Sequence, residues 1–347
     1  MKNFLLSAFI AASVAMPATA AVNADDGQLR LNDREYFERQ GVNVLVYSNT
    51  FNGGFNDEKN SGIEIIQHGV RVAQGGAIRL NNTPEQWDLV PQMTSRKVNR
   101  DGNSIEIGLR YEEYDFDSRI VVTGHGDAVD IAVYLDKPVP QAIAGEAGLN
   151  LEFLPSQYWL KTFQMDGRLG RMPRYAVSNT IVRPNSEKAQ QYRGFKTYDD
   201  RGTGKFVDPL PLEHGHQLLL ATDDPNRLMT IESSDAELSL YDGRMLAQNG
   251  WFVVRSVLPV GKTGKVLSWT VKPHAIKGWI REPNIGFSQM GYMPDQPKVA
   301  VIELDKHYTI LPEATLWRVG KDGQESAAYR GPVSDWGDYF KDHYVRF

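Results

Sequence analysis

Residues 104–111 have the sequence SIEIGLRY, in which apolar and polar side chains alternate along the chain. A period of two is typical of a β-strand that buries one face. The turn-forming residues Arg100-Asp101-Gly102-Asn103 precede this stretch, and residues 118–122 and 129–135 repeat the alternation on either side of Gly124-His125-Gly126-Asp127. Strands joined by short Gly/Asp turns predict antiparallel hairpins.

The same rhythm occurs on both sides of this region. Residues 63–66 and 70–72 flank His68-Gly69, which predicts another hairpin. Further strands are expected at residues 42–47, 217–221, 228–232, 238–241, 252–257 and 266–271. We therefore predict an all-β protein in which residues 21–275 form a large β-sandwich region of one or two domains.

The middle of the chain is less regular. Gly167 and Gly170 argue against a helix over residues 161–174. Residues 179–208 are polar and glycine-rich, which predicts a long surface excursion, and residues 186–192 are the best helix candidate in it.

The first twenty residues have the pattern of a secretory signal peptide. Lys2 supplies a positive charge, residues 4–16 are mainly apolar, and Ala18-Thr19-Ala20 is a small-residue cleavage motif. The apolar run is shorter than the roughly 20 residues that span a bilayer. We expect residues 1–20 to be removed, no membrane span after this cleavage, and a periplasmic or secreted mature protein.

Composition excludes several classes of function. The chain has no cysteine, so it has neither disulfides nor thiolate metal ligands. Its formal net charge is −5 and no block of consecutive basic residues occurs, so nucleic acid is not an expected partner.

Residues 284–301 have the sequence NIGFSQMGYMPDQPKVAV. This segment resembles the opening of the immunoglobulin-like domain of family-nine glycoside hydrolases, where a first strand ends in a Gln-x-Gly-Tyr-x-Pro turn and a Pro-Lys pair starts the second strand. Gly291 suits a tight turn and Pro294 fixes the exit from it. Residues 331–340 and 344–347 resemble the region before the last strands of that domain and the start of one of them.

The resemblance sets the expected domain boundaries. Residues 276–283 are a linker, and residues 284–347 are an immunoglobulin-like β-sandwich that the family pattern implies is incomplete. Residues 150–156 and Met165-Asp166-Gly167 resemble, more weakly, the large β domain that some exported bacterial members carry ahead of the immunoglobulin-like one.

The family hydrolyses β-linked glucans by inversion, with an Asp base and a Glu acid on a helical barrel. The barrel's Asp-Ala-Gly-Asp signature does not occur in this sequence. The resemblance therefore implies a non-catalytic N-terminal portion of such an enzyme, which supports a catalytic barrel as its partner and leaves the polysaccharide undefined. The alternative is a stand-alone glycan-binding or adhesive β-sandwich protein.

Three polar groups are candidates for independent chemistry. Glu112, Glu113, Asp115 and Asp117 form the densest carboxylate cluster, and a solvated strand face explains it better than an acid/base pair does. His214-Gly215-His216 has the spacing of two metal-binding imidazoles on one side of a strand but lacks an evident third ligand. Residues 223–226 could form a calcium loop or an ordinary turn. We expect no catalytic residue, cofactor site or metal site.

Aromatic residues make up 10% of the chain, and seven of them are Trp. Large rings usually belong to the core, but exposed rings can stack on sugars. If the N-terminal region binds a β-glucan or oligosaccharide, the candidate stacking rings are Tyr158, Trp159, Trp251 and Trp279.

Overall fold

The fold is that of a computed structural model, which describes residues 8–9, 27–48, 62–84, 88–176, 180–184, 196–198, 204–245, 250–339 and 341–347. The chain divides into two compact units, one of residues 26–277 and one that contains residues 278–347. Apart from residues 8–9, the predicted signal peptide lies outside the described residues, and so does the predicted helix at 186–192. No helix in the described part of the chain is long and apolar enough to cross a membrane.

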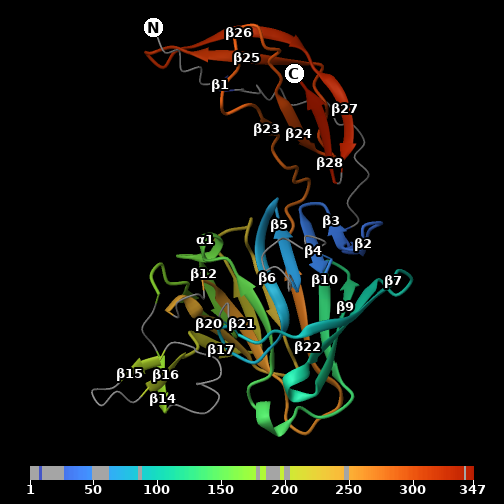
Figure 1. The fold of residues 1–347 in the computed structure, drawn as a ribbon, viewed down its shortest axis with the longest axis vertical. Helices are drawn as coiled ribbons and strands as arrows, with labels where there is room; N and C mark the ends of the chain where they lie inside the picture. The colour runs from blue at the N-terminus through green and yellow to red at the C-terminus, as the bar shows by residue number, and fades with distance from the viewer. Residues whose placement is uncertain are drawn as a thin grey trace. The chain divides into compact units, whose positions relative to one another are not determined.

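The predicted all-β class is confirmed. Residues 26–277 contain two nine-stranded antiparallel sheets (Figure 1). The first sheet has the order β13 (Arg168–Arg171), β12 (Thr162–Met165), β18 (Gln217–Leu220), β19 (Met229–Glu232), β22 (Gly264–Pro273), β10 (Ala128–Leu135), β9 (Phe116–His125), β8 (Ser104–Tyr111) and β7 (Gln92–Asn99).

The second sheet runs through strands that are far apart in the sequence. Its order is β17 (Glu213–Gly215), β20 (Leu238–Asp242), β21 (Phe252–Val257), β11 (Gly148–Phe153), β6 (Val70–Arg79), β5 (Ile63–Gln67), β4 (Val42–Val46), β3 (Phe37–Arg39) and β2 (Arg30–Leu31). The one α-helix among the described residues, α1, is the single turn Pro155–Tyr158.

Alternation along the strands places the core between these two sheets. Ile105, Ile107 and Leu109 of β8 are 0–1% exposed, as their period of two predicts. They belong to one apolar cluster that also includes Ile63 and Ile65 of β5, so both sheets contribute to the same β-sandwich core.

Both predicted hairpins are confirmed. Strands β9 and β10 pair from His125 and Ala128 onward, and β5 and β6 pair from Gln67 and Val70 onward. Two-residue loops match the twist of the flanking strands when both residues have positive φ. His68 and Gly69 have φ values of 48° and 75°.

Part of the predicted surface excursion is a sheet. Strands β14 (Thr180–Pro184), β16 (Gly204–Pro209) and β15 (Lys196–Tyr198) pair antiparallel in that order. The sequence pattern predicted a surface excursion here and no strands, because these polar, glycine-rich residues lack the alternation that marks the other strands.

The unit containing residues 278–347 has two sheets. One has the order β23 (Asn284–Gly286), β24 (Val301–Asp305), β28 (Asp342–Arg346) and β27 (Ser334–Tyr339), and the other has β1 (Ala8–Phe9), β25 (Glu313–Val319) and β26 (Glu325–Pro332). Its buried apolar cluster contains only Ile302, Leu304 and Val345 among the described residues. Residues 344–347 were expected to begin one of the final strands of this domain. Residues 344–346 belong to β28, the last described strand in the sequence, which lies inside the sheet and pairs with both β24 and β27.

The turn that carries the family resemblance has a local polar scaffold. Gly291 has φ 83°, a conformation that favours glycine. The Ser288 hydroxyl donates to the Gly291 carbonyl at 2.9 Å, and the Tyr292 hydroxyl donates to the Val299 carbonyl at 2.6 Å. These bonds hold the segment between β23 and β24 in a compact loop.

Candidate functional site

The sheet that contains β11 has one face toward the core. A row of buried polar side chains lies on its other face. Glu152 lies between Leu151 and Phe153, and both of these neighbours point into the core. Because successive side chains on a strand point to opposite faces, Glu152 projects to the other face. Its Cα partner across β6 is Gln74.

Strand β5 extends the row by a second carboxylate. Glu64 lies between the core residues Ile63 and Ile65, so it projects to the same face as Glu152. Strand β6 separates β5 from β11, which puts Glu64 and Glu152 two strands apart with Gln74 between them. Glu64 is 2% exposed and Glu152 is 6% exposed, so the polar row is covered.

A glycine allows close packing on the Glu152 carboxylate. Gly75 has φ 64°, and a Cβ atom at this position would lie 2.7 Å from Glu152 Oε2. Any side chain would therefore need both an unfavourable backbone conformation and a displaced carboxylate. The sequence pattern Gly75-Gly76 contained no signal for this role.

Burial dominates the electrostatics of both carboxylates. Burial raises the pKa of Glu152 to about 7, against the opposing charge of Arg79, whose Nη2 lies 4.0 Å from Glu152 Oε1. Burial also raises the pKa of Glu64, although Arg71 Nε lies only 3.0 Å from Glu64 Oε2 and acts in the opposite direction. A carboxyl group with a pKa near neutrality can both donate and accept a proton.

Tyr47 adds a buried hydroxyl to this region. It follows β4, has φ 47°, and is 8% exposed. Burial raises its pKa, and the Arg79 charge opposes this shift. Within the part of the chain that the structure describes, neither the Tyr47 hydroxyl nor Arg79 Nε has a hydrogen-bond partner. Unpaired buried polar atoms are costly, and a water molecule or a hydroxyl-bearing ligand would satisfy them.

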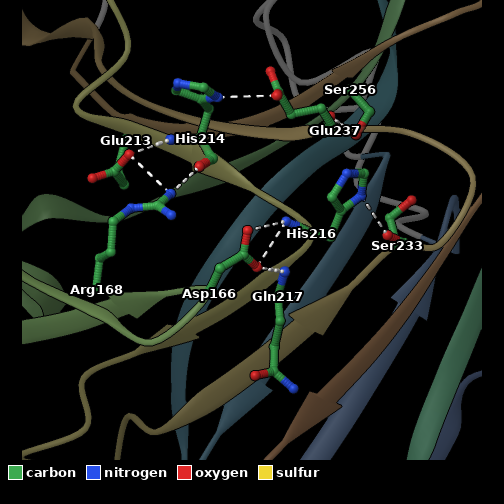
Figure 2. A network of polar contacts seen from close by, with 9 residues as sticks. All are labelled: Asp166, Arg168, Glu213, His214, His216, Gln217, Ser233, Glu237 and Ser256. Atoms are coloured by element: carbon green, nitrogen blue, oxygen red, sulfur yellow. Dashed lines mark hydrogen bonds and ion pairs between the residues drawn. The ribbon is translucent and has the colours of Figure 1, made fainter.

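A second polar region surrounds His214-Gly215-His216 (Figure 2). The Asp166 carboxylate accepts hydrogen bonds from the backbone N–H groups of His216 and Gln217 at 2.8–3.1 Å, and these bonds lower the pKa of Asp166. A Cβ on Gly215 would collide with Asp166 Oδ2, so glycine is required for this close approach.

The two imidazoles have separate partners. His214 Nδ1 lies 2.9 Å from Glu237 Oε2, and His216 Nδ1 donates to the Ser233 carbonyl at 3.0 Å (Figure 2). Across the described ranges, no group of three or more His, Cys, Asp or Glu side chains could hold a metal ion. The predicted pair of imidazoles is explained by these local contacts.

The acidic cluster forms around one arginine. Arg110 contacts Glu112 at 2.9 Å, Asp115 at 2.6 Å and Asp117 at 2.7 Å. The hydrogen bond from Arg110 lowers the pKa of Asp115. All of these carboxylates and Glu113 are exposed. An acid/base pair needs pKa values pushed apart by burial, which exposed carboxylates lack.

Residues 223–226 form a turn whose carboxylates have protein partners. Asp223 accepts from the Thr162 backbone N–H at 2.9 Å, and Asp224 pairs with Lys161 at 2.6 Å. Asp224 also accepts from the Asn226 N–H at 2.9 Å, which is the usual Asx-turn contact.

The candidate stacking rings differ in exposure. Tyr158 is 0% exposed and packs edge-on against Phe153 with ring centroids 5.3 Å apart, so its prediction as a sugar-stacking ring is wrong. The short α1 turns this side chain inward, which the sequence did not reveal. Trp159 is 46% exposed, whereas Trp251 and Trp279 are half-buried.

Comparisons with known proteins place the chain in no family. No family model matches it, and no curated protein matches it. HI1317 has a crystal structure similar to this chain with a TM-score of 0.32 and 9% identity, covering 71% of this chain and 98% of that one. The Slr1438 protein from Synechocystis sp. PCC 6803 gives a TM-score of 0.33 and 10% identity, covering 74% and 100%. Similarities this weak carry no argument about function.

Proposed function

We propose that this chain is the non-catalytic N-terminal portion of an exported family-nine glycoside hydrolase, and that its C-terminal unit packs against a helical catalytic barrel. The family resemblance of residues 284–347 motivates this proposal. The apolar surface of the same unit is the observation that carries it.

The unit exposes many large apolar side chains for so small a core. Beside a buried cluster of three residues, the unit exposes large apolar side chains, several of them by more than half. They are Phe287, Met290, Met293, Val299, Ile310, Leu311, Tyr329, Trp336 and Tyr339. Where such side chains gather into a patch, another part of the protein commonly covers it. A helical barrel that packs on this unit would supply such cover.

The reading frame downstream of residue 347 tests the proposal directly. We expect it to continue into a sequence of amphipathic helices that carries an Asp-Ala-Gly-Asp motif. A stop codon immediately after Phe347 in the genomic DNA would contradict the proposal.

The polypeptide alone should release no reducing sugar from soluble cellulose derivatives, because its acidic cluster is exposed and bound to Arg110. The assay should include Asp115→Asn and Glu152→Gln variants. Hydrolysis that either substitution abolishes would contradict the proposal and would assign catalysis to the substituted carboxylate.

The second candidate function is that of a stand-alone glycan-binding protein. The exposed ring of Trp159 favours it, because an apolar ring face suits a sugar face.

If this second candidate is correct, Trp159→Ala should weaken glycan affinity by roughly fivefold, since one stacked ring contributes roughly 1 kcal/mol. Affinity electrophoresis in gels that contain different β-glucans would measure the change. Leu169→Ala, which removes an exposed side chain without a ring, is the matched control. Equal mobility of wild type and Trp159→Ala in every gel would exclude Trp159 as a stacking surface.

A further inference from the structure

At the tip of the β5–β6 hairpin, Gly69 is exposed, but the side chain of His68 is buried, although hairpin loops usually face solvent. His68 is 7% exposed, and the preceding Gln67 is 0% exposed. Positive φ at both His68 and Gly69 fixes the two-residue loop, and histidine is one of the side chains that accepts this conformation more readily than most. The imidazole therefore has a defined position.

The hairpin tip joins two segments of the opposite sheet. Gln67 Nε2 donates to the carbonyls of Leu228 and His274, at 2.8 Å in both cases. The His274 backbone N–H donates to the Leu228 carbonyl at 3.0 Å. Leu228 directly precedes β19 and His274 directly follows β22, so the hairpin holds the ends of two neighbouring strands.

The His68 ring makes one contact to each of these segments. Its Nδ1 lies 3.0 Å from the Asn226 carbonyl oxygen, and the Ile276 backbone N–H lies 3.1 Å from its Nε2. A carbonyl oxygen only accepts hydrogen bonds, so Nδ1 carries the hydrogen. A backbone N–H only donates, so Nε2 must be unprotonated. The two contacts together select the neutral imidazole with the hydrogen on Nδ1.

We propose that His68 is an acid-released latch on residues 274–277, the segment with which the chain leaves the N-terminal unit. At neutral pH the ring accepts the Ile276 N–H and holds this segment against the hairpin. Protonation turns Nε2 into a hydrogen-bond donor. It can then no longer accept the hydrogen bond from the Ile276 N–H, and two donors face each other. Of the two side-chain hydrogen bonds to residues 274–277 named above, only the one from Gln67 to the His274 carbonyl then remains.

The charges around the ring favour the neutral form at pH 7. Burial lowers the pKa of His68, and the positive charge of Arg227 and the neighbouring His274 lower it further. The hydrogen bond to Asn226 and the carboxylate of Asp224 act in the opposite direction, and the net pKa lies below the usual 6.5. The latch should therefore be closed at pH 7.5 and open progressively below pH 6.5.

Hydrogen exchange on the full chain tests the proposal. Mass spectrometry of the peptide around residues 274–280 reports exchange of the Ile276 amide, after correction for the intrinsic pH dependence of exchange. From pH 7.5 to pH 5, the corrected rate should rise roughly fivefold, as expected for the loss of one hydrogen bond. His68→Phe should exchange fast at both pH values.

His274→Phe is the matched control because the His274 backbone, and not its ring, makes the contacts described above. It should still show faster exchange in acid, with the rise displaced to higher pH because His274 no longer lowers the pKa of His68. A wild-type rate that does not rise once nitrogen-15 NMR shows the His68 ring to be protonated, or a pH dependence that persists in His68→Phe, would overturn the proposal.

A measurement on the wild type keeps the test independent of how His68→Phe folds. Nitrogen-15 NMR of the imidazoles distinguishes the two neutral tautomers. We expect His68 to carry its hydrogen on Nδ1 at pH 7.5 and to gain the second proton below pH 6.5. A neutral ring with its hydrogen on Nε2 would contradict the geometry on which the latch depends.

Discussion

Replacing Glu152 with glutamine should remove a pH dependence of about 3 kcal/mol from the free energy of unfolding. The pKa of Glu152 is raised from 4.5 to about 7 by burial, so between these values the folded state binds more protons than the unfolded state. Stability from this group is fully present below pH 4.5 and is lost as the pH rises through 7. At pH 8, Glu152→Gln should therefore be more stable than wild type, and near pH 4.5 the two should be similar.

Urea unfolding at intervals between pH 4.5 and pH 8 measures this difference. Glu113→Gln makes the same chemical change on an exposed side chain and should leave the pH profile of the wild type unchanged. Burial raises the pKa of Glu64 too, so a shallower slope of the same sign should remain in Glu152→Gln. His68 acts in the opposite direction in acid, and both glutamine variants retain it. Parallel profiles of wild type and Glu152→Gln would show that Glu152 is not desolvated in solution.

Replacing Arg281 with methionine should destabilise the C-terminal unit by about 2–3 kcal/mol, a value between those for exposed and buried ion pairs. Arg281 pairs with Glu303 at 2.9 Å and with Asp342 at 2.8 Å, and its backbone N–H donates to Asp305 at 3.2 Å. The side chains of Arg281 and Asp342 are only 19% and 14% exposed. Loss of the guanidinium would leave two carboxylates close together without a counter-charge.

The matched control is Arg330→Met in the same unit. Arg330 pairs with Glu313 at 2.7 Å, but these side chains are 70% and 50% exposed, so less than about 1 kcal/mol should be lost. Hydrogen exchange of peptides from β24 and β28 would report the unit separately from residues 26–277. Equal protection of these peptides in the two variants would show that Arg281 does not stabilise the sheet.

The alternation of apolar and polar residues determined where most of the strands lie in the sequence. Ile105, Ile107 and Leu109 are buried because their spacing places them on one face, whatever lies opposite. The His68-Gly69 turn could also be predicted from the sequence, because a two-residue loop between two alternating stretches has few possible conformations. The exposed acidic cluster behaves as expected, since one nearby arginine and solvent satisfy its charges.

The family assignment and the export of the chain stay predictions. They rest on the motif at residues 284–301 and on the pattern of residues 1–20. The sequence also led to one error in the candidate site. Tyr158 and Trp159 are adjacent and chemically alike, yet one is in the core and the other is exposed, because the helical turn α1 ends at Tyr158 and Trp159 lies outside it.

Only the tertiary structure decided the character of Glu64 and Glu152. Alternation placed each of them on the polar face of its strand, which predicts contact with solvent. Pairing of β5, β6 and β11 brought two residues distant in sequence into one row, and burial of that face raised both of their pKa values. Side-chain spacing along a strand specifies which face a residue occupies. It does not specify which distant segment covers that face, and for a carboxylate this cover decides whether the charged form is stable.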